Sequence, residues 1–196
     1  HEERIGKELA ARFTDFGCTV TMDDVGNLIA VIPGTRPDTV LLSTHMDTAG
    51  TDTGIRPIIE DGIIKTDGTT ILGADDKSGI AGCLELLTIL ESNPGVEHPT
   101  LEFVVSVGEE SGLLGSRQMD LSRLNSTYGF VLDTAGAIGA IPSVLDAPPG
   151  TTVADNIFFL GVSHAAVLAA VIASLGGVHW WAVKVGRQPA NEKLGM

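Results

Sequence analysis

Two segments of the chain carry apolar residues at the three- or four-residue spacing of an amphipathic helix, and we predict helices over residues 2–16 and 76–91. The apolar positions are Ile5, Leu9, Phe13 and Phe16 in the first segment and Ile80, Leu84, Leu87 and Leu90 in the second. Gly17 follows the first segment, at a position where helices commonly end.

Shorter apolar runs bounded by turn residues predict β-strands. They are CTVTMDD (18–24), NLIAVIPG (27–34), TVLLSTH (39–45), TLEFVVSVG (100–108) and YGFVLD (128–133). The segment IRPIIEDGIIKTDG has the pattern of a hairpin with its turn at Asp61-Gly62. Because strands alternate with helices, we predict an α/β fold, a three-layer αβα domain with a mostly parallel mixed sheet.

Polar residues gather where the predicted strands end. One strand ends in His45, with Asp47 two residues later, and another is followed by the pair Glu109-Glu110. Asp133 ends a third strand. The stretch ILGADDKSGIAG places Asp75 and Asp76 just before the second helix. Ligands of such sheets bind beyond the carboxyl ends of the strands, so we expect these side chains to share one edge.

One imidazole and six carboxylates need a compensating positive charge in a common cleft. A divalent metal ion supplies it, and the mixed donor set favours Zn²⁺, Mn²⁺ or Co²⁺ over Ca²⁺ or Mg²⁺. One carboxylate of the Asp75-Asp76 pair would then bridge two ions. Taken singly, each element has a structural explanation, such as an exposed His-x-Asp or an Asp pair capping a helix. Their joint placement favours a metal site.

The composition disfavours several classes of partner. The formal net charge is −13, and all of it falls within residues 1–133. Such a charge disfavours nucleic acid and anionic membrane surfaces as partners. Cys18 and Cys83 are far apart and no CxxC spacing occurs, so we predict no disulfide framework and a cytoplasmic setting.

Several blocks of the sequence resemble the peptidase T-like branch of the zinc-dependent exopeptidases, a group that includes aminoacylase and the glutamate carboxypeptidases. They are LLSTHMDT, GTTILGADDKSGIA, VVSVGEESGLLGS, DDVGNLIAVIPG and YGFVLDTAG. The resemblance covers roughly residues 1–141 and implies a metallopeptidase catalytic domain there. It also implies hydrolysis of the N-terminal residue of short peptides by a water activated by two metal ions.

The resemblance implies a metal ligand set. His45 and Asp133 would bind the first ion, Asp75 would bridge both ions, and Glu110 would bind the second. The cofactor would be Zn²⁺, two ions per full-length site, with Co²⁺ or Mn²⁺ possible.

Two further residues receive catalytic roles from the resemblance. Asp47 would hydrogen-bond to the metal-binding imidazole and fix its orientation, and Glu109 would act as the general base. An aspartate at Asp133 resembles the aminopeptidase and dipeptidase members. The alternatives are a deacylase or carboxypeptidase of the same family and an inactive metal-binding fragment.

The resemblance ends after Ile141, and we expect the chain to be truncated or altered there. Residues 142–196 would form a divergent apolar tail in place of the lid domain, through which relatives form homodimers. His164 and His179 are poor matches to the family's later histidines, so we expect about one tightly bound ion per chain and feeble activity. Residues 157–178 carry no charge, a length sufficient to span a membrane, but a buried helix or an altered end is the preferred interpretation.

Overall fold

The computed structural model describes residues 2–126 and 128–133 of the chain. The elements, in chain order, are α1 (Glu3–Asp15), β1 (Thr19–Met22), β2 (Leu28–Ile32), β3 (Thr39–His45), β4 (Ile58–Glu60), β5 (Ile63–Lys65), α2 (Ala74–Ser92), β6 (Thr100–Ser106), α3 (Leu114–Gln118), the short 3-10 helix η1 (Leu121–Arg123) and β7 (Tyr128–Val131). Every predicted helix and strand in this part of the chain is present.

Five of the strands form one sheet, in the order β1-β2-β6-β3-β7. β2 is antiparallel to both of its neighbours, whereas β3 pairs in parallel with β6 and with β7. Four strands therefore point the same way, and the predicted α/β fold with a mostly parallel mixed sheet is confirmed. The central position of β3 places its last residue, His45, beside Ser106 at the end of β6.

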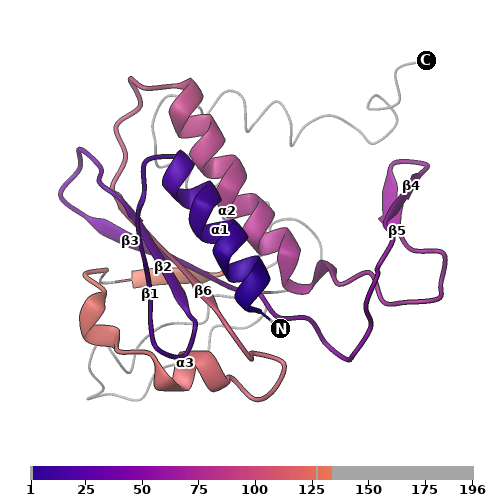
Figure 1. The fold of residues 1–196 in the computed structure, drawn as a ribbon. Helices are drawn as coiled ribbons and strands as arrows, with labels where there is room; N and C mark the ends of the chain where they lie inside the picture. Colours follow the sequence, from indigo (N-terminus) through magenta and orange to yellow (C-terminus); the bar gives the residue numbers. More distant parts are fainter. Residues whose placement is uncertain (1, 127, 134–196) are drawn as a thin grey trace, which may run out of the picture.

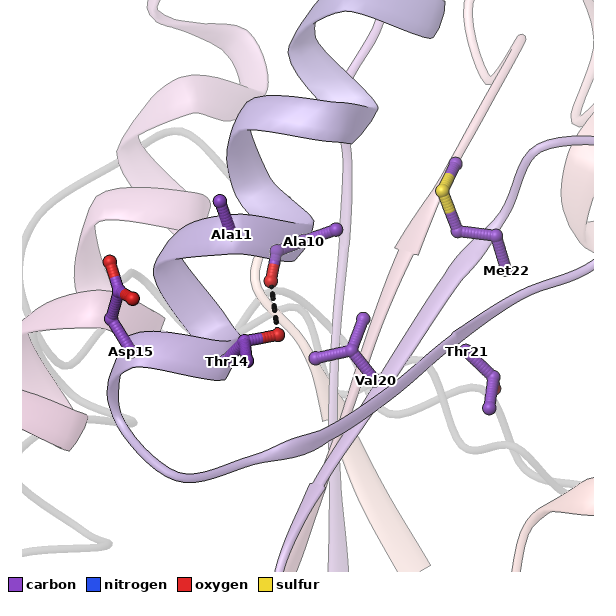
Figure 2. A pocket seen from close by; sticks show the side chains of 7 residues that line it. All are labelled: Ala10, Ala11, Thr14, Asp15, Val20, Thr21 and Met22. Carbon is purple, nitrogen blue, oxygen red and sulfur yellow. Dashed lines mark hydrogen bonds between the residues drawn. The ribbon is translucent and has the colours of Figure 1, made fainter.

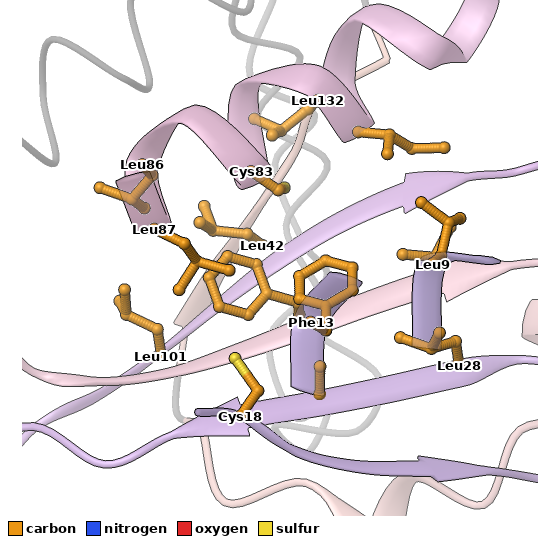
Figure 3. Close-up of a cluster of buried hydrophobic side chains, with 14 of the residues drawn as sticks. Leu9, Phe13, Cys18, Leu28, Leu42, Cys83, Leu86, Leu87, Leu101 and Leu132 are labelled. Atoms are coloured by element: carbon orange, nitrogen blue, oxygen red, sulfur yellow. The ribbon is translucent and has the colours of Figure 1, made fainter. Parts of the chain in front are cut away.

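Helices α1 and α2 cover one face of the sheet (Figure 1). Along β6, Leu101, Phe103 and Val105 belong to the apolar cluster beneath these helices, as the period-two alternation of a strand requires. The ring of Phe13 in α1 lies 5.3 Å, centroid to centroid, from the ring of Phe103. Phe13 lies at the centre of this core (Figure 3). This packing holds both helices against the strands that carry the candidate site.

The opposite face has a smaller apolar cluster. Ile29, Leu41 and Val104 are buried there against Met119 and Leu124, which belong to the segment containing α3 and η1. The described residues thus form three layers: two long helices, the sheet, and a thinner layer of short helices (Figure 1).

A buried carboxylate fixes the approach to β7. Glu102 is 1% exposed, and its oxygens accept the backbone N–H groups of Asn125 (2.9 Å) and Ser126 (3.0 Å). These hydrogen bonds satisfy a carboxylate that would otherwise be costly to bury. They also anchor the chain just before the strand that leads to Asp133.

The predicted hairpin forms a separate two-stranded sheet, β4–β5, which extends from the body of the domain (Figure 1). Its turn residues Asp61 and Gly62 have φ of 51° and 74°, the positive values that a tight two-residue turn uses. Ile59 and Ile63 are 77% and 63% exposed.

Several predictions concern residues 134–196, which lie outside the described part of the chain. They are the boundary after Ile141, the divergent tail, the assignments of His164 and His179, and the interpretation of the uncharged run. Within the described residues, none of the helices has both the length and the apolar character needed to cross a membrane.

Candidate metal centre

The predicted site residues meet at one edge of the sheet because three neighbouring strands run in parallel. β3 ends at His45, β6 ends three residues before Glu109, and β7 ends two residues before Asp133. Asp75 enters the same edge from the start of α2. The structure therefore brings together side chains that lie up to 88 positions apart in the sequence.

The imidazole of His45 is the centre of the group. It is 2% exposed, and its Nε2 atom lies 3.1 Å from Asp75 Oδ1, 3.8 Å from Asp133 Oδ1 and 3.9 Å from Glu109 Oε2. Three carboxylates from three segments thus converge on one face of a buried ring nitrogen. Nε2 is the atom that would coordinate an ion at this point.

Two overlapping groups of donor atoms are close enough to hold metal ions, each with ligand atoms within 4.8 Å of one another. One contains His45, Glu109 and Asp133, and the other contains His45, Asp75 and Glu110. Glu109 thus lies as close to the imidazole as the predicted ligand Asp133. The division between Glu109 as base and the other residues as ligands stays a prediction.

Asp47 connects the imidazole to the glutamate loop. Its carboxylate is buried, and Oδ1 lies 3.2 Å from His45 Nδ1, on the side of the ring opposite the carboxylate group. The same carboxylate accepts the backbone N–H groups of Glu109 and Glu110, one at each oxygen, both at 3.0 Å. Asp47 lies beside His45 as expected, but Nδ1 has no hydrogen-bond partner among the described residues, so the predicted hydrogen bond to the imidazole stays a prediction. The two amide contacts were not predicted.

The two aspartates of the pair have different surroundings. The side chain of Asp75 is 68% exposed and faces His45, whereas Asp76 is 1% exposed. Asp76 Oδ1 accepts the backbone N–H of Gly79 at 3.0 Å, and the backbone oxygen of Asp76 accepts the hydroxyl of Thr44. The peptide bond between the two aspartates is cis. The carboxylate of Asp75 therefore faces the candidate site, whereas Asp76 contacts its own helix through its carboxylate and β3 through its backbone oxygen.

Two residues that the sequence analysis did not assign hold the site loops. Asn27 is fully buried, and its side chain accepts the N–H of Val107 (3.1 Å) and donates to the carbonyl oxygen of Gly115 (3.0 Å). These bonds close the loop that carries Glu109. Lys77, in the first turn of α2, donates to the backbone oxygen of Asp47. The sequence signals are weak: an asparagine after a turn, and a lysine after two aspartates.

The crowding of carboxylates shifts several pKa values. Burial opposes protonation of His45, but the surrounding carboxylates, led by Asp133, outweigh it and raise the pKa of the imidazole. Burial raises the pKa of Asp133 to about 6. Burial also raises the pKa of Glu109, with Glu110 adding to the effect and His45 opposing it. Negative charge is therefore in excess here, as expected of residues arranged for a cation.

The residues present fit a transition-metal ion. A buried imidazole whose Nε2 faces several carboxylate oxygens offers the nitrogen and oxygen donors that zinc sites use. Nδ1 has no hydrogen-bond partner among the described residues but lies 3.2 Å from Asp47 Oδ1, where zinc-binding histidines commonly have a carboxylate. A hollow between α1 and β1 has no such donor set. It is lined by Ala10, Ala11, Thr14, Asp15, Val20, Thr21 and Met22, and the Thr14 hydroxyl already donates to Ala10 (Figure 2).

Comparison with known proteins places the chain among peptidases. The sequence model of Peptidase family M28 matches residues 27–158. Uncharacterized protein YqjE of Bacillus subtilis is 42% identical over 167 residues, which cover 81% of this chain and 44% of that protein. Peptidase T of Bacillus velezensis is 32% identical over 170 residues, covering 68% and 41% respectively.

The crystal structure of aminopeptidase PepT from Bacillus cereus superposes with a TM-score of 0.68 at 44% identity, covering 71% of this chain and 40% of that one. The predicted resemblance to peptidase T is thereby confirmed. The chain spans less than half the length of each of these relatives.

The close contact at Gly79 gives a test of how α2 is held. A Cβ atom there would lie 2.5 Å from Asp76 Oδ1 and 2.7 Å from the carbonyl oxygen of Leu132. We expect Gly79→Ala to lower the free energy of unfolding by about 1–3 kcal/mol, as overpacking typically does. Gly82→Ala is the matched control in the same helix, because its Cβ would meet nothing within 4 Å, and it should raise stability by up to about 1 kcal/mol. Urea unfolding followed by circular dichroism measures both, and equal stability of the two variants would contradict this account.

The raised pKa of Asp133 predicts a pH dependence of the metal-free chain. A carboxyl with a raised folded-state pKa stabilises the protein below its unfolded pKa, near 4, and this stabilisation is lost as the pH rises through the folded value of about 6. We expect chelator-treated protein to lose stability between about pH 4 and 6. Asp133→Asn should flatten that loss because an amide does not ionise.

Asp67→Asn is the control for this measurement. Asp67 is exposed, and hydrogen bonds from Thr69 lower its pKa, so its replacement should leave the slope between pH 4 and 6 in place. An unchanged slope in Asp133→Asn would show that another group causes the dependence.

Proposed function

The chain belongs to Peptidase family M28, and we propose that it carries the catalytic part of a zinc-dependent exopeptidase that removes the N-terminal residue of short peptides. The observation that carries the proposal is the convergence of Asp75, Asp133 and Glu109 on Nε2 of the buried His45. The preference for N-terminal residues rests on likeness to aminopeptidase PepT and to peptidase T.

In this proposal, His45, Asp75 and Asp133 hold one ion, and Asp75 and Glu110 contribute to a second. Zinc bound there supplies Lewis acidity and makes a water molecule acidic enough to lose a proton near neutral pH. The imidazole is held by burial on all sides and by Asp47 next to Nδ1. The imidazole thus has little freedom to reorganise when an ion binds, whereas the exposed carboxylates of Asp75 and Glu110 can adjust.

Glu109 is the general base in this proposal. Its side chain is 28% exposed, so it can reach a water molecule and a substrate, and burial raises its pKa above the usual glutamate value. The carboxylate accepts a proton from the attacking water and then donates it to the leaving amine. The hydrogen bond from the Glu109 N–H to Asp47 fixes the backbone that carries this group.

The direct test is peptidase activity with and without metal. The purified chain and a full-length relative would be assayed with free-amine tripeptides and with N-acyl amino acids, before and after chelation. We expect tripeptide cleavage, feeble in this chain and stronger in the full-length relative, that chelators abolish and Zn²⁺ or Co²⁺ restores. Activity that persists in excess chelator would reject the metal-dependent mechanism. Hydrolysis of N-acyl amino acids alone would show a deacylase instead, and metal binding without turnover would show an inactive fragment.

A paired substitution tests the roles of the two glutamates. Glu109→Gln should keep bound metal and lower kcat by about 100-fold or more, since it removes a general base. Glu110→Gln should instead reduce the metal content measured by elemental analysis. The two variants are matched controls for each other, because each removes one charge from the same loop. Equal metal loss in both would show that Glu109 is a ligand.

A further inference from the structure

Lys77 joins two segments that carry site residues. It lies in the first turn of α2, two residues after Asp75, and its ammonium group donates to the backbone oxygen of Asp47 and to Oγ1 of Thr48. Thr48 also lies against the start of the helix, because a Cβ on Gly73 would be 3.1 Å from its Cγ2 atom. The loop after β3 is therefore fastened to α2 at two neighbouring points.

The acceptors of Lys77 are neutral, although carboxylates surround it. Burial lowers the pKa of Lys77, while the charges of Asp47, Asp75, Asp76 and Glu110 oppose that shift. An ammonium group is costly to bury unless its N–H groups donate hydrogen bonds. Here those groups donate to a backbone oxygen and a hydroxyl of the loop after β3. These hydrogen bonds therefore fix the positions of residues 47 and 48.

The fastened loop controls the geometry of the site. Asp47 is within 3.2 Å of His45 Nδ1 and accepts the N–H groups of Glu109 and Glu110. A shift of this loop would move the imidazole relative to Asp75 and would release the glutamate loop. We propose that Lys77 is a positioning residue of the metal centre, an inference that rests on the proposed function. It holds the loop after β3 on α2, so that His45 and Asp75 stay in place for a shared ion.

A purely electrostatic effect of Lys77 predicts the opposite result. A cation near the site repels a bound metal ion, so its removal would tighten binding. Loss of a positioning contact loosens binding instead, and contacts that orient metal ligands typically contribute about 10- to 100-fold in affinity. The sign of the change in Kd therefore separates the two explanations.

The experiment measures the Kd of Zn²⁺ for the full 196-residue chain by competition with a chromophoric chelator. Lys77→Met removes the contact together with the charge, and Thr48→Val removes one acceptor without any change of charge. Lys7→Met is the matched control, since Lys7 is 72% exposed and paired with Glu3 on the surface of α1. Circular dichroism checks the fold, and absorption of the Co²⁺ form reports the ligand geometry.

We expect Lys77→Met and Thr48→Val each to raise the Kd by about tenfold and to alter the Co²⁺ spectrum. Lys7→Met should stay within about twofold of the original chain. If Lys77→Met does not fold, Thr48→Val decides alone. An unchanged or tighter Kd in either folded variant would overturn the inference. Absence of Zn²⁺ and Co²⁺ binding in the unsubstituted chain would reject the proposed function itself, which is a separate result.

Discussion

The carboxylate of Asp47 is the contact on which the arrangement of the site depends. It lies next to Nδ1 of His45 and accepts two successive backbone N–H groups, those of Glu109 and Glu110. A single buried side chain thus connects the end of β3 to the loop after β6. Since backbone amides are fixed donors, this contact sets where the glutamate side chains begin.

Three other buried polar side chains also hold the segments that carry the site. Asn27 closes the glutamate loop at Val107 and Gly115, Asp76 holds the head of α2, and Glu102 anchors the chain before β7. Each is a buried polar side chain that binds backbone groups, of a distant segment for Asn27 and Glu102 and of its own helix for Asp76. Glu109, Glu110 and Asp133 lie in loops beyond the strand ends, and buried hydrogen bonds give the loop of the two glutamates a defined position.

The sequence was sufficient to predict most of the fold and which polar side chains meet at one edge of the sheet. Strand ends such as TVLLSTH are recognisable because a buried parallel strand is a continuous apolar run, and its end is marked by the first polar residues. The rule that parallel strands present their carboxyl ends at one edge then brings His45, Glu109 and Asp133 together. The hairpin turn at Asp61-Gly62 followed from local turn chemistry alone.

The contacts that hold the site could not be predicted in the same way. Asp47 meets the amide of Glu109 across 62 positions of sequence, and Asn27 meets Val107 across 80. Such partners depend on the exact register of β2, β3 and β6, which apolar patterning does not determine to the residue. The contacts of Lys77 could not be predicted either, because its acceptors are a backbone oxygen and a threonine hydroxyl, which have no sequence signature.

The charge distribution explains why these contacts are needed. Carboxylates that converge on one imidazole repel each other, and burial followed by the neighbouring carboxylates raises the pKa values of Asp133 and Glu109. Without fixed backbone, the loops would separate to relieve the repulsion. Asp47 and Asn27 prevent this by binding the loops at the backbone and not at the charged groups, which leaves the carboxylate oxygens near His45 available to an ion. In a site of this kind, the fold holds the carboxylates together before a cation binds, and the bound cation then neutralises their mutual repulsion.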